Sequence, residues 1–375
     1  MQETDFLIVG AGVAGASIAY RLAPNASVMV IDMEDQAGYH TTGRSAAFYA
    51  ETYGGPLIQP LTSASKGFFH SPPGGFSEAP LISPRGVVHV FRQDQSEEAK
   101  ALFTGLKASL PDLTMLTQAE VLTLMPQLLA DNILGGIYDP NCSALDVAAL
   151  HQGFLKGAKQ KGAKVVLGSA LTHATFQKGR WAIDTPMGLV RAKIVINAAG
   201  AWADKVAEYS GVRPLGLAPL RRTVVTIANP ENLIFCKKSP IAMQVGAENY
   251  FKPEGHGYLI SPGDEVFMPP CDVQPEQEDI ALAVYQFEQA TGATVKKVEA
   301  KWAGLRSFAK DRAPIIGFAA DMPSFFWSAG HGGFGIQTAP AWSELAAALV
   351  TGQPVPERLL SFNVRAEHYS PARLL

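Results

Sequence analysis

Two short apolar runs near the start of the chain are separated by glycines and a helix-like stretch. Residues 6–9 are continuously apolar, which is typical of a strand buried on both faces of a parallel sheet. Residues 16–22 have the pattern of a helix, and residues 27–31 form a second apolar run that ends at Asp32. This order of strand, glycine-rich turn, helix and strand predicts a βαβ unit.

The glycines of this unit fall in the sequence GAGVAG at positions 10–15. Gly10 permits a tight turn, Gly12 lets the backbone approach a pyrophosphate at the helix N-terminus, and Gly15 lets helix and strand pack closely. Asp32 lies where a carboxylate accepts hydrogen bonds from ribose hydroxyls, and its charge disfavours a 2′-phosphate. The alternative is a glycine turn without a ligand, but the complete βαβ context favours dinucleotide binding.

Two later segments repeat the pattern of an apolar strand followed by small residues. Residues 192–196 precede NAAGAWAD at 197–204, and residues 325–328 precede AGHGGFGIQT at 329–338, after which a helix is expected from 339 to about 350. Residues 311–317 predict another turn and strand. Glycine amides and a helix N-terminus would therefore lie beside whatever the fold binds.

The stretch after the second strand helps to distinguish NAD from FAD. Residues 38–47 are polar and punctuated by glycine, where NAD dehydrogenases usually continue into another βα unit. A long loop of small and hydroxyl residues suits a cofactor that extends beyond its pyrophosphate, so we expect FAD. An ordinary surface loop is the alternative.

Composition narrows the class of protein. The chain has 375 residues, of which 47% are hydrophobic and 17% charged, so it can bury a large core and is not globally disordered. Lys and Arg number 31 against 34 Asp and Glu, which is not the overall basic charge of a typical nucleic-acid binder, although a local patch stays open.

The three cysteines form no CxxC pair, so no structural metal is expected, and their low number fits a reducing cytoplasm. The chain start lacks a basic region typical of export signals, and no apolar run reaches the roughly 20 residues that a membrane span needs. We therefore expect a cytoplasmic protein, with peripheral contact at the inner face of the membrane as an open alternative.

Taken together, the chain resembles the D-amino-acid oxidase (DAO) superfamily of FAD-dependent oxidoreductases over most of its length. The motifs that carry this resemblance are GAGVAG with Asp32, TTGRSAA at 41–47, VINAAGAW at 195–202, RPLGLAPLRR at 213–222, WAGLRSF at 302–308, DRAPIIG at 311–317 and GHGGFGIQT at 330–338. WAGLRSF, DVQPEQ at 272–277 and ALHQG at 149–153 are most similar to the D-arginine dehydrogenase subgroup of bacterial D-amino-acid dehydrogenases.

The resemblance implies an α/β (α+β two-domain) fold of the glutathione-reductase/DAO type. A Rossmann-like FAD-binding domain would comprise residues 1–83, 141–212 and 302–375, and an interleaved substrate domain built on an antiparallel sheet would comprise 84–140 and 213–301. In these insertions we expect strands at 86–91, 222–227 and 250–252 and helices at 97–110, 118–124 and 278–291. The active site would lie between the two domains.

The resemblance also assigns roles to individual residues. Those expected at FAD are Gly10, Gly12, Val13, Ala14, Gly15, Asp32, Met33, Thr42, Gly43, Arg44, Ser45, Ala46, Ala47, Leu171, Ala198, Gly200, Trp202, Arg306, Gly330, Gly332, Gly333, Phe334, Gly335, Ile336, Gln337 and Thr338. Those expected to be catalytic or to bind substrate are Tyr53, Arg222, Tyr250, Arg306 and His331.

Arginine suits an amino-acid substrate because its planar guanidinium pairs with a carboxylate through two hydrogen bonds. Arg221 and Arg222 are neighbours on an expected strand, so only one can face the cleft, and the resemblance favours Arg222. Surface salt bridges are the alternative for Arg222 and Arg306. Tyr53 would sit on a mobile lid with Gly54 as part of its hinge, or else be an ordinary core residue.

His331 would contact the substrate or affect the protonation of its amine, or have a purely structural role. Three further positions line the expected side-chain pocket, namely Phe48, Ala50 and Val87. In arginine-preferring relatives a glutamate takes the position of Val87, so we expect an apolar or aromatic D-amino acid here rather than D-arginine. Glu51, Glu248 or His89 could restore polarity to this pocket.

The resemblance implies hydride transfer from the α-carbon of a D-amino acid to flavin N5, giving an imine that hydrolyses to a 2-oxo acid and ammonia. One alternative is an amine, glycine or sarcosine oxidase, and another is a 2-hydroxy-acid dehydrogenase on the same fold. A catalytically inactive flavoprotein scaffold is the non-enzymatic alternative. The electrons could pass to a quinone, another carrier or O2, and we expect no nucleic-acid partner and no metal.

Overall fold

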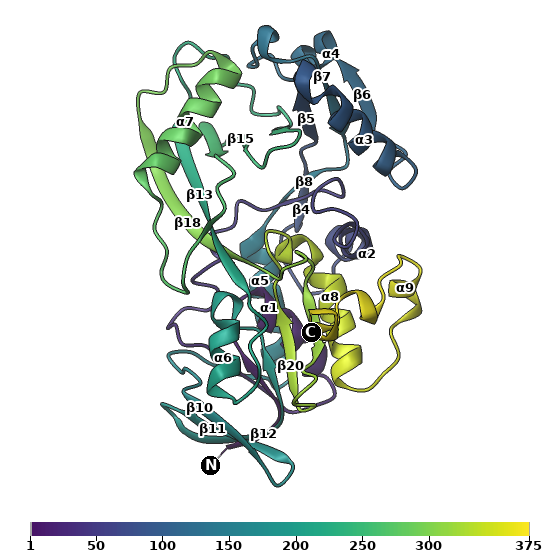
Figure 1. The fold of residues 1–375 in the computed structure, drawn as a ribbon, viewed down its shortest axis with the longest axis vertical. Helices are drawn as coiled ribbons and strands as arrows, with labels where there is room; N and C mark the ends of the chain where they lie inside the picture. The colour runs from purple at the N-terminus through teal and green to yellow at the C-terminus, as the bar shows by residue number, and fades with distance from the viewer. Residues whose placement is uncertain (1, 375) are drawn as a thin grey trace.

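A computed structural model describes residues 2–374 of the chain (Figure 1). An eight-stranded sheet lies in the lower part of the view and is called the cofactor sheet below. Its strands are β1 (Gln2–Val9), β2 (Val28–Ile31), β9 (Lys164–Val166), β10 (His173–Gln177), β11 (Arg180–Thr185), β12 (Gly188–Asn197), β19 (Ile315–Phe318) and β20 (Phe325–Ala329).

The centre of the cofactor sheet is parallel. Strand β1 pairs in parallel with both β2 and β12, and β12 pairs in parallel with β20. All residues of β2 and β20 and the last residues of β1 and β12 are buried, which explains the uninterrupted apolar sequence there. Helices pack on the sheet, with α1 (Val13–Leu22) against α5 (Val147–Gln160) and α8 (Gly335–Val350), and α2 (Gln59–His70) against α8.

A second sheet of nine strands forms the upper part of the molecule and is called the substrate sheet below (Figure 1). Every pairing in it is antiparallel except that of β14 with β5. Its strands are β5 (Val87–Phe91), β6 (Thr114–Thr117), β7 (Gly135–Asp139), β13 (Ala218–Ala228), β14 (Ile241–Gln244), β15 (Tyr250–Glu254), β16 (Gly257–Ser261), β17 (Val266–Phe267) and β18 (Val298–Phe308).

Shorter elements complete the fold. A small antiparallel sheet contains β3 (Phe48–Tyr49), β4 (Ile82–Pro84) and β8 (Ser143–Leu145). Further helices are α3 (Ser96–Lys107), α4 (Gln118–Leu124), α6 (Ala203–Tyr209), α7 (Gln277–Thr291) and α9 (Glu357–Leu360). The mixed α/β architecture with a parallel and an antiparallel sheet confirms the predicted fold class. The residue ranges of the two domains stay a prediction, and the boundary expected at 301–302 falls inside β18.

One predicted element begins at a different residue. The sequence places residues 335–338 in a glycine loop and starts the helix at 339, but α8 begins at Gly335 and contains Pro340 in its interior. The first turn is stabilised by burial of Ile336, Gln337 and Thr338, and the Thr338 hydroxyl donates to the Phe334 carbonyl. Tertiary packing thus extends the helix through residues whose local preference is for a loop.

Candidate active site

The central parallel strands of the cofactor sheet end at one edge. A glycine-rich or acidic segment follows each of these strands. Their last residues are Val9, Ile31, Asn197 and Ala329. Parallel strands bring their carboxyl ends together, and ligands of open α/β sheets bind at such an edge. A cavity of about 550 Å³ lies there and extends to the substrate sheet.

Most of the residues expected at the cofactor line this cavity. They are Gly10, Gly12, Val13, Ala14, Asp32, Met33, Thr42, Arg44, Ser45, Ala46, Leu171, Ala198, Gly200, Trp202, Arg306, Gly330, Gly332, Gly333, Gly335 and Ile336. Among the residues expected to be catalytic, Arg222, Tyr250, Arg306 and His331 line it as well.

Six expected cofactor residues do not line the cavity, and their contact with FAD stays a prediction. They are Gly15, Gly43, Ala47, Phe334, Gln337 and Thr338. Gly15 packs on the turn, because a Cβ there would lie 1.8 Å from the Gly10 carbonyl oxygen. Gln337 instead connects α8 to the segment before Tyr53, since it accepts from the Ala50 amide and donates to the Tyr53 carbonyl.

The glycine turn between β1 and α1 is held in a narrow space. Gly10 has φ +106°, and a Cβ there would lie 2.4 Å from the Ala198 carbonyl oxygen. The Asp32 carboxylate accepts hydrogen bonds from the amides of Ala11 and Glu34, so it shapes the turn as well as lining the cavity. His151 Nε2 lies 2.8 Å from the Ala11 carbonyl oxygen and so contacts the turn. His151 belongs to the ALHQG motif, but this contact was not predicted from the sequence.

Arg222 and Arg306 face the same side of the substrate sheet because of the strand register. Strand β13 pairs with β18 so that Leu220 lies opposite Arg306, and Arg222 lies two residues beyond Leu220. Residues i and i+2 share a face, so the two arginines are diagonal neighbours. Arg221 faces the other side, where it pairs with Glu276 at 3.1 Å and Asp279 at 2.7 Å.

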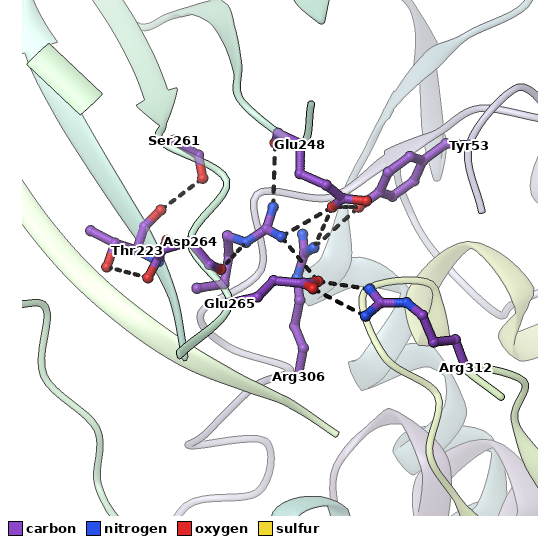
Figure 2. Close-up of polar contacts among 9 residues, drawn as sticks. Tyr53, Thr223, Glu248, Ser261, Asp264, Glu265, Arg306 and Arg312 are labelled. Carbon is purple, nitrogen blue, oxygen red and sulfur yellow. Dashed lines mark hydrogen bonds and ion pairs between the residues drawn. The ribbon is translucent and has the colours of Figure 1, made fainter. Parts of the chain in front are cut away.

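The two arginines converge on one carboxylate oxygen (Figure 2). Glu248 Oε2 accepts hydrogen bonds from Arg222 Nη2 at 3.0 Å, from Arg306 Nη1 at 3.3 Å and from the Tyr53 hydroxyl at 3.0 Å. Arg306 Nη1 also donates to the Tyr53 hydroxyl oxygen at 3.1 Å. We call Arg222, Arg306 and Tyr53 the carboxylate clamp. Its geometry binds a carboxylate through charge and direction together.

A second glutamate extends this network towards the surface. Glu265 lies 3.5 Å from Arg222 Nη2 and forms a two-bond pair with Arg312 at 2.7 and 3.0 Å. The Arg222 Nε donates to the Asp264 carbonyl, which fixes the guanidinium from its other edge. No motif in the sequence predicted Asp264, Glu265 or Arg312 as site residues.

Glu248, Arg306 and Tyr53 keep their ordinary charge states. Burial alone would raise the pKa of Glu248, but the charges of Arg222 and Arg306 outweigh it and hold that pKa below its usual value. Burial opposes the charge on Arg306, whereas Tyr53, Tyr250 and Glu248 raise its pKa further. Burial raises the pKa of Tyr53 to about 12, so its hydroxyl stays protonated and can donate.

The residues expected to form the side-chain pocket belong to a buried apolar cluster instead of lining the cavity. Phe48, Ala50 and Val87 pack there together with Tyr250, which also lines the cavity. The Phe48 ring lies 5.5 Å from that of Tyr53 and 5.7 Å from that of Tyr250, between ring centres. The surroundings of the clamp are therefore apolar and aromatic on this side.

Two residues proposed to restore polarity here have other partners. Glu51 accepts from the Ser63 hydroxyl and pairs with Lys66 on α2. His89 Nε2 lies 3.0 Å from the Thr52 hydroxyl. The third, Glu248, is bound by the carboxylate clamp.

His331 follows β20, and contacts of its imidazole ring with Trp342 and Ser328 fix the side chain. The ring stacks on Trp342 with 4.3 Å between ring centres, and Nε2 lies 3.2 Å from the Ser328 hydroxyl. Burial lowers the pKa of His331 to about 4, so the imidazole is neutral at physiological pH. It can accept or donate a hydrogen bond at the cavity but does not supply a positive charge there.

His89 and His331 together predict a loss of stability in mild acid. Burial lowers both pKa values to about 4, while the unfolded chain takes up the protons near pH 6.5. Unfolding therefore becomes more favourable as the pH falls from 6.5 towards 4, by at most about 2 kcal/mol per histidine at pH 5. Calorimetric Tm values between pH 7 and 5 should fall, and His89→Gln should flatten this slope. An unchanged slope in that variant would contradict the assignment.

Two classes of feature are absent from the part of the chain that the structure describes. Residues 2–374 hold no group of three or more His, Cys, Asp or Glu side chains that could bind a metal ion. No helix within the same residues is both long and apolar enough to cross a membrane.

Comparison with known proteins places this geometry in context. The model of the DAO family, described as FAD dependent oxidoreductase, matches residues 5–349. Mitochondrial dimethylglycine dehydrogenase of Mus musculus is 26% identical over 276 residues, which are 69% of this chain and 30% of that protein, so the chain spans about a third of this relative. Glycine oxidase of Bacillus licheniformis is 23% identical over 363 residues, 94% of each chain.

Among solved structures, L-proline dehydrogenase from P. horikoshii is similar in fold. Its TM-score is 0.82 at 20% identity, and the match covers 99% of this chain and 98% of that one. These relatives act on different amines and amino acids according to their names, so the narrower resemblance to D-arginine dehydrogenases stays a prediction.

Proposed function

Because this chain belongs to the DAO family of FAD-dependent oxidoreductases and FAD is its cofactor, we propose that it oxidises the carbon–nitrogen bond of a D-amino acid. The favoured side chain is apolar or aromatic. The observation that supports this proposal most directly is the carboxylate clamp, in which Arg222, Arg306 and Tyr53 already hold a carboxylate oxygen at the cofactor cavity.

The residues at the edge of the cofactor sheet fit FAD. Helix α1 begins after Gly12 with no side-chain cap and no acidic residue in its first turn, so its amide end suits a pyrophosphate. Gly333 lets the Arg306 guanidinium pack against the backbone, since a Cβ there would lie 2.7 Å from the guanidinium carbon, and both residues line the cavity. FAD, when bound, supplies the acceptor for the hydride that the substrate loses.

The protein's own residues bind and orient the substrate. Arg222 and Arg306 would hold the substrate carboxylate, with the Tyr53 hydroxyl donating a third hydrogen bond. The ring of Tyr250, which lines the cavity, would limit where the side chain can lie. Fixing these groups sets the direction of the α-carbon–hydrogen bond, which is the main contribution that orientation makes to the rate.

Besides the substrate, the reaction needs water and an electron acceptor, for which a quinone, another carrier or O2 would serve. The substrate loses two electrons and two hydrogens in forming an imine, and water then hydrolyses the imine to a 2-oxo acid and ammonia. The amine must be neutral for this step, so the rate is expected to rise with pH as the substrate ammonium ionises. His331 is neutral at physiological pH and lines the cavity, where it would contact the substrate.

The apolar surroundings support the preference for an uncharged side chain. Val87 is fully buried among apolar residues, so no carboxylate stands at this position to pair with a guanidinium in the substrate. A cationic side chain would lose its hydration there without a partner, which is costly.

An anaerobic titration tests the proposed function. D-Phenylalanine and D-leucine should bleach the absorbance of the oxidised flavin in the purified holoprotein, whereas their L-enantiomers and D-arginine should bleach it far more slowly. Phenethylamine and 2-hydroxy acids serve as controls that lack the carboxylate or the amine. Faster bleaching by a 2-hydroxy acid or by an amine without a carboxylate would reject the proposal.

A further inference from the structure

The carboxylate that the clamp holds belongs to the protein itself. Glu248 lies in the turn between β14 and β15, and its Oε2 receives all three hydrogen bonds from the clamp. These are the donors that the proposed function assigns to the substrate. In Figure 2 the Glu248 carboxylate lies beside the Tyr53 hydroxyl and the Arg306 guanidinium, and dashed lines join these groups.

The donors of the clamp are already engaged. Arg222 Nε donates to the Asp264 carbonyl, Nη1 to the Glu248 carbonyl at 3.4 Å, and Nη2 to the Glu248 carboxylate. A substrate carboxylate with the same hydrogen bonds would need the place that Oε2 takes, and two carboxylates this close would repel each other. Both cannot occupy the clamp.

We propose that Glu248 is a displaceable internal carboxylate, so that a carboxylated substrate enters the clamp by exchange with this side chain. The inference rests on the proposed function for the identity of the substrate. Under this exchange Glu248 lowers the affinity of the clamp for carboxylates, because a carboxylate binds only after the contacts of Glu248 with the clamp are broken.

The Glu248 side chain can move out of the clamp into solvent, whereas the side chains of Arg222 and Arg306 are buried in place. The Glu248 side chain is 35% exposed, so rotation about its own bonds takes it to solvent. Arg222 and Arg306 are only 4% and 14% exposed, and leaving them unpaired would cost much more than leaving a glutamate in water. Glu248 therefore keeps the buried charges compensated until a substrate carboxylate replaces it.

Charge balance supports an exchange rather than a simple addition. Arg222, Arg306 and Arg312 face two carboxylates, those of Glu248 and Glu265. If a monocarboxylate replaces Glu248, the number of charges in the network is unchanged. Adding the substrate without displacing Glu248 would place a third carboxylate beside the two buried arginines.

Binding of 3-phenylpropanoate to the holoprotein tests this inference. This compound is phenylalanine without its amine, so it can occupy the clamp but cannot be oxidised. Its Kd is measured by titration calorimetry for the wild type, Glu248→Gln and Glu248→Ala. We expect Kd to fall by about tenfold or more in both variants, since loss of the internal competitor corresponds to at least one charge-assisted hydrogen bond.

Controls separate this inference from the proposed function. Glu254→Gln makes the same change on β15 at a residue paired with Lys252, and its Kd should equal that of the wild type. A Kd that is unchanged or higher in both Glu248 variants, or no binding by any of them, overturns the inference. If Kd falls in these variants but no amino acid bleaches the flavin, the exchange stands and the proposed oxidation fails.

Discussion

Arg222→Met is expected to raise the KM for a D-amino-acid substrate by about 100-fold, with a much smaller change in kcat. The variant removes a guanidinium that is 4% exposed and points at the carboxylate position of the clamp. Hydrogen bonds to charged groups contribute roughly 1.5–3 kcal/mol each, and about 2.7 kcal/mol corresponds to a factor of 100. Because the carboxylate does not take part in the chemistry, most of the loss should be in binding, which raises KM.

Steady-state kinetics with D-phenylalanine measures this effect, with Arg312→Met as the matched control. Arg312 contacts Glu265 at the outer end of the network and is 47% exposed, so its loss should change KM by no more than about threefold. Arg306→Met should behave like Arg222→Met. If the KM of Arg222→Met stayed within threefold of the wild type, the clamp would not be the carboxylate site.

Gly15→Ala is expected to yield protein with little or no bound flavin and a much lower Tm. Alanine is normally preferred to glycine within a helix by about 1 kcal/mol, so propensity alone predicts a gain. The surroundings reverse the sign, because a Cβ at Gly15 would lie 1.8 Å from the Gly10 carbonyl oxygen, which belongs to the turn that faces the pyrophosphate position. The closest group is the Gly10 carbonyl, which is backbone and cannot rotate away, and the fully buried Ile8 side chain lies 3.0 Å away.

Gly67→Ala in α2 is the matched control, because nothing lies within 4 Å of a Cβ at that position. It should keep its full flavin content and gain up to about 1 kcal/mol in stability. Flavin per protein is read from the visible absorbance, and Tm from calorimetry. A Gly15→Ala variant with normal flavin content would show that close packing of α1 on the turn is not needed for the cofactor.

Local patterns predicted the parts of the fold that depend on neighbouring residues. The apolar run at 6–9 falls within β1, and the run at 27–31 contains β2, since burial on both faces leaves a clear signature. The start of α8 was predicted four residues too late, because burial of Ile336 and Thr338 depends on packing that no local pattern contains. In the site, strand alternation placed Arg221 and Arg222 on opposite faces, and the structure has them so.

The role of Glu248 was beyond the reach of the sequence. Its carboxylate meets Arg222 and Arg306 only because the β14–β15 turn, β13 and β18 are brought together by the pairing of strands far apart in the chain. The expected contacts of Phe48, Ala50 and Val87 with a side-chain pocket depended on the same tertiary arrangement. The structure packs these three residues together in a buried cluster that also includes Tyr250.

The two arginines of the clamp and the apolar residues near them come from different parts of the chain. Arg222 and Arg306 lie on β13 and β18, whereas Phe48 and Val87 lie on β3 and β5. Point substitutions in the second group can therefore alter which amino acids are accepted while recognition of their common acid group persists. Inserting one residue into β13 or β18 would instead shift the pairing of these strands by one residue. The shift would turn one of the two guanidiniums to the opposite face of the sheet. Evolution of new specificities on this scaffold should accordingly favour exchanges of side chains over changes of length in these two strands.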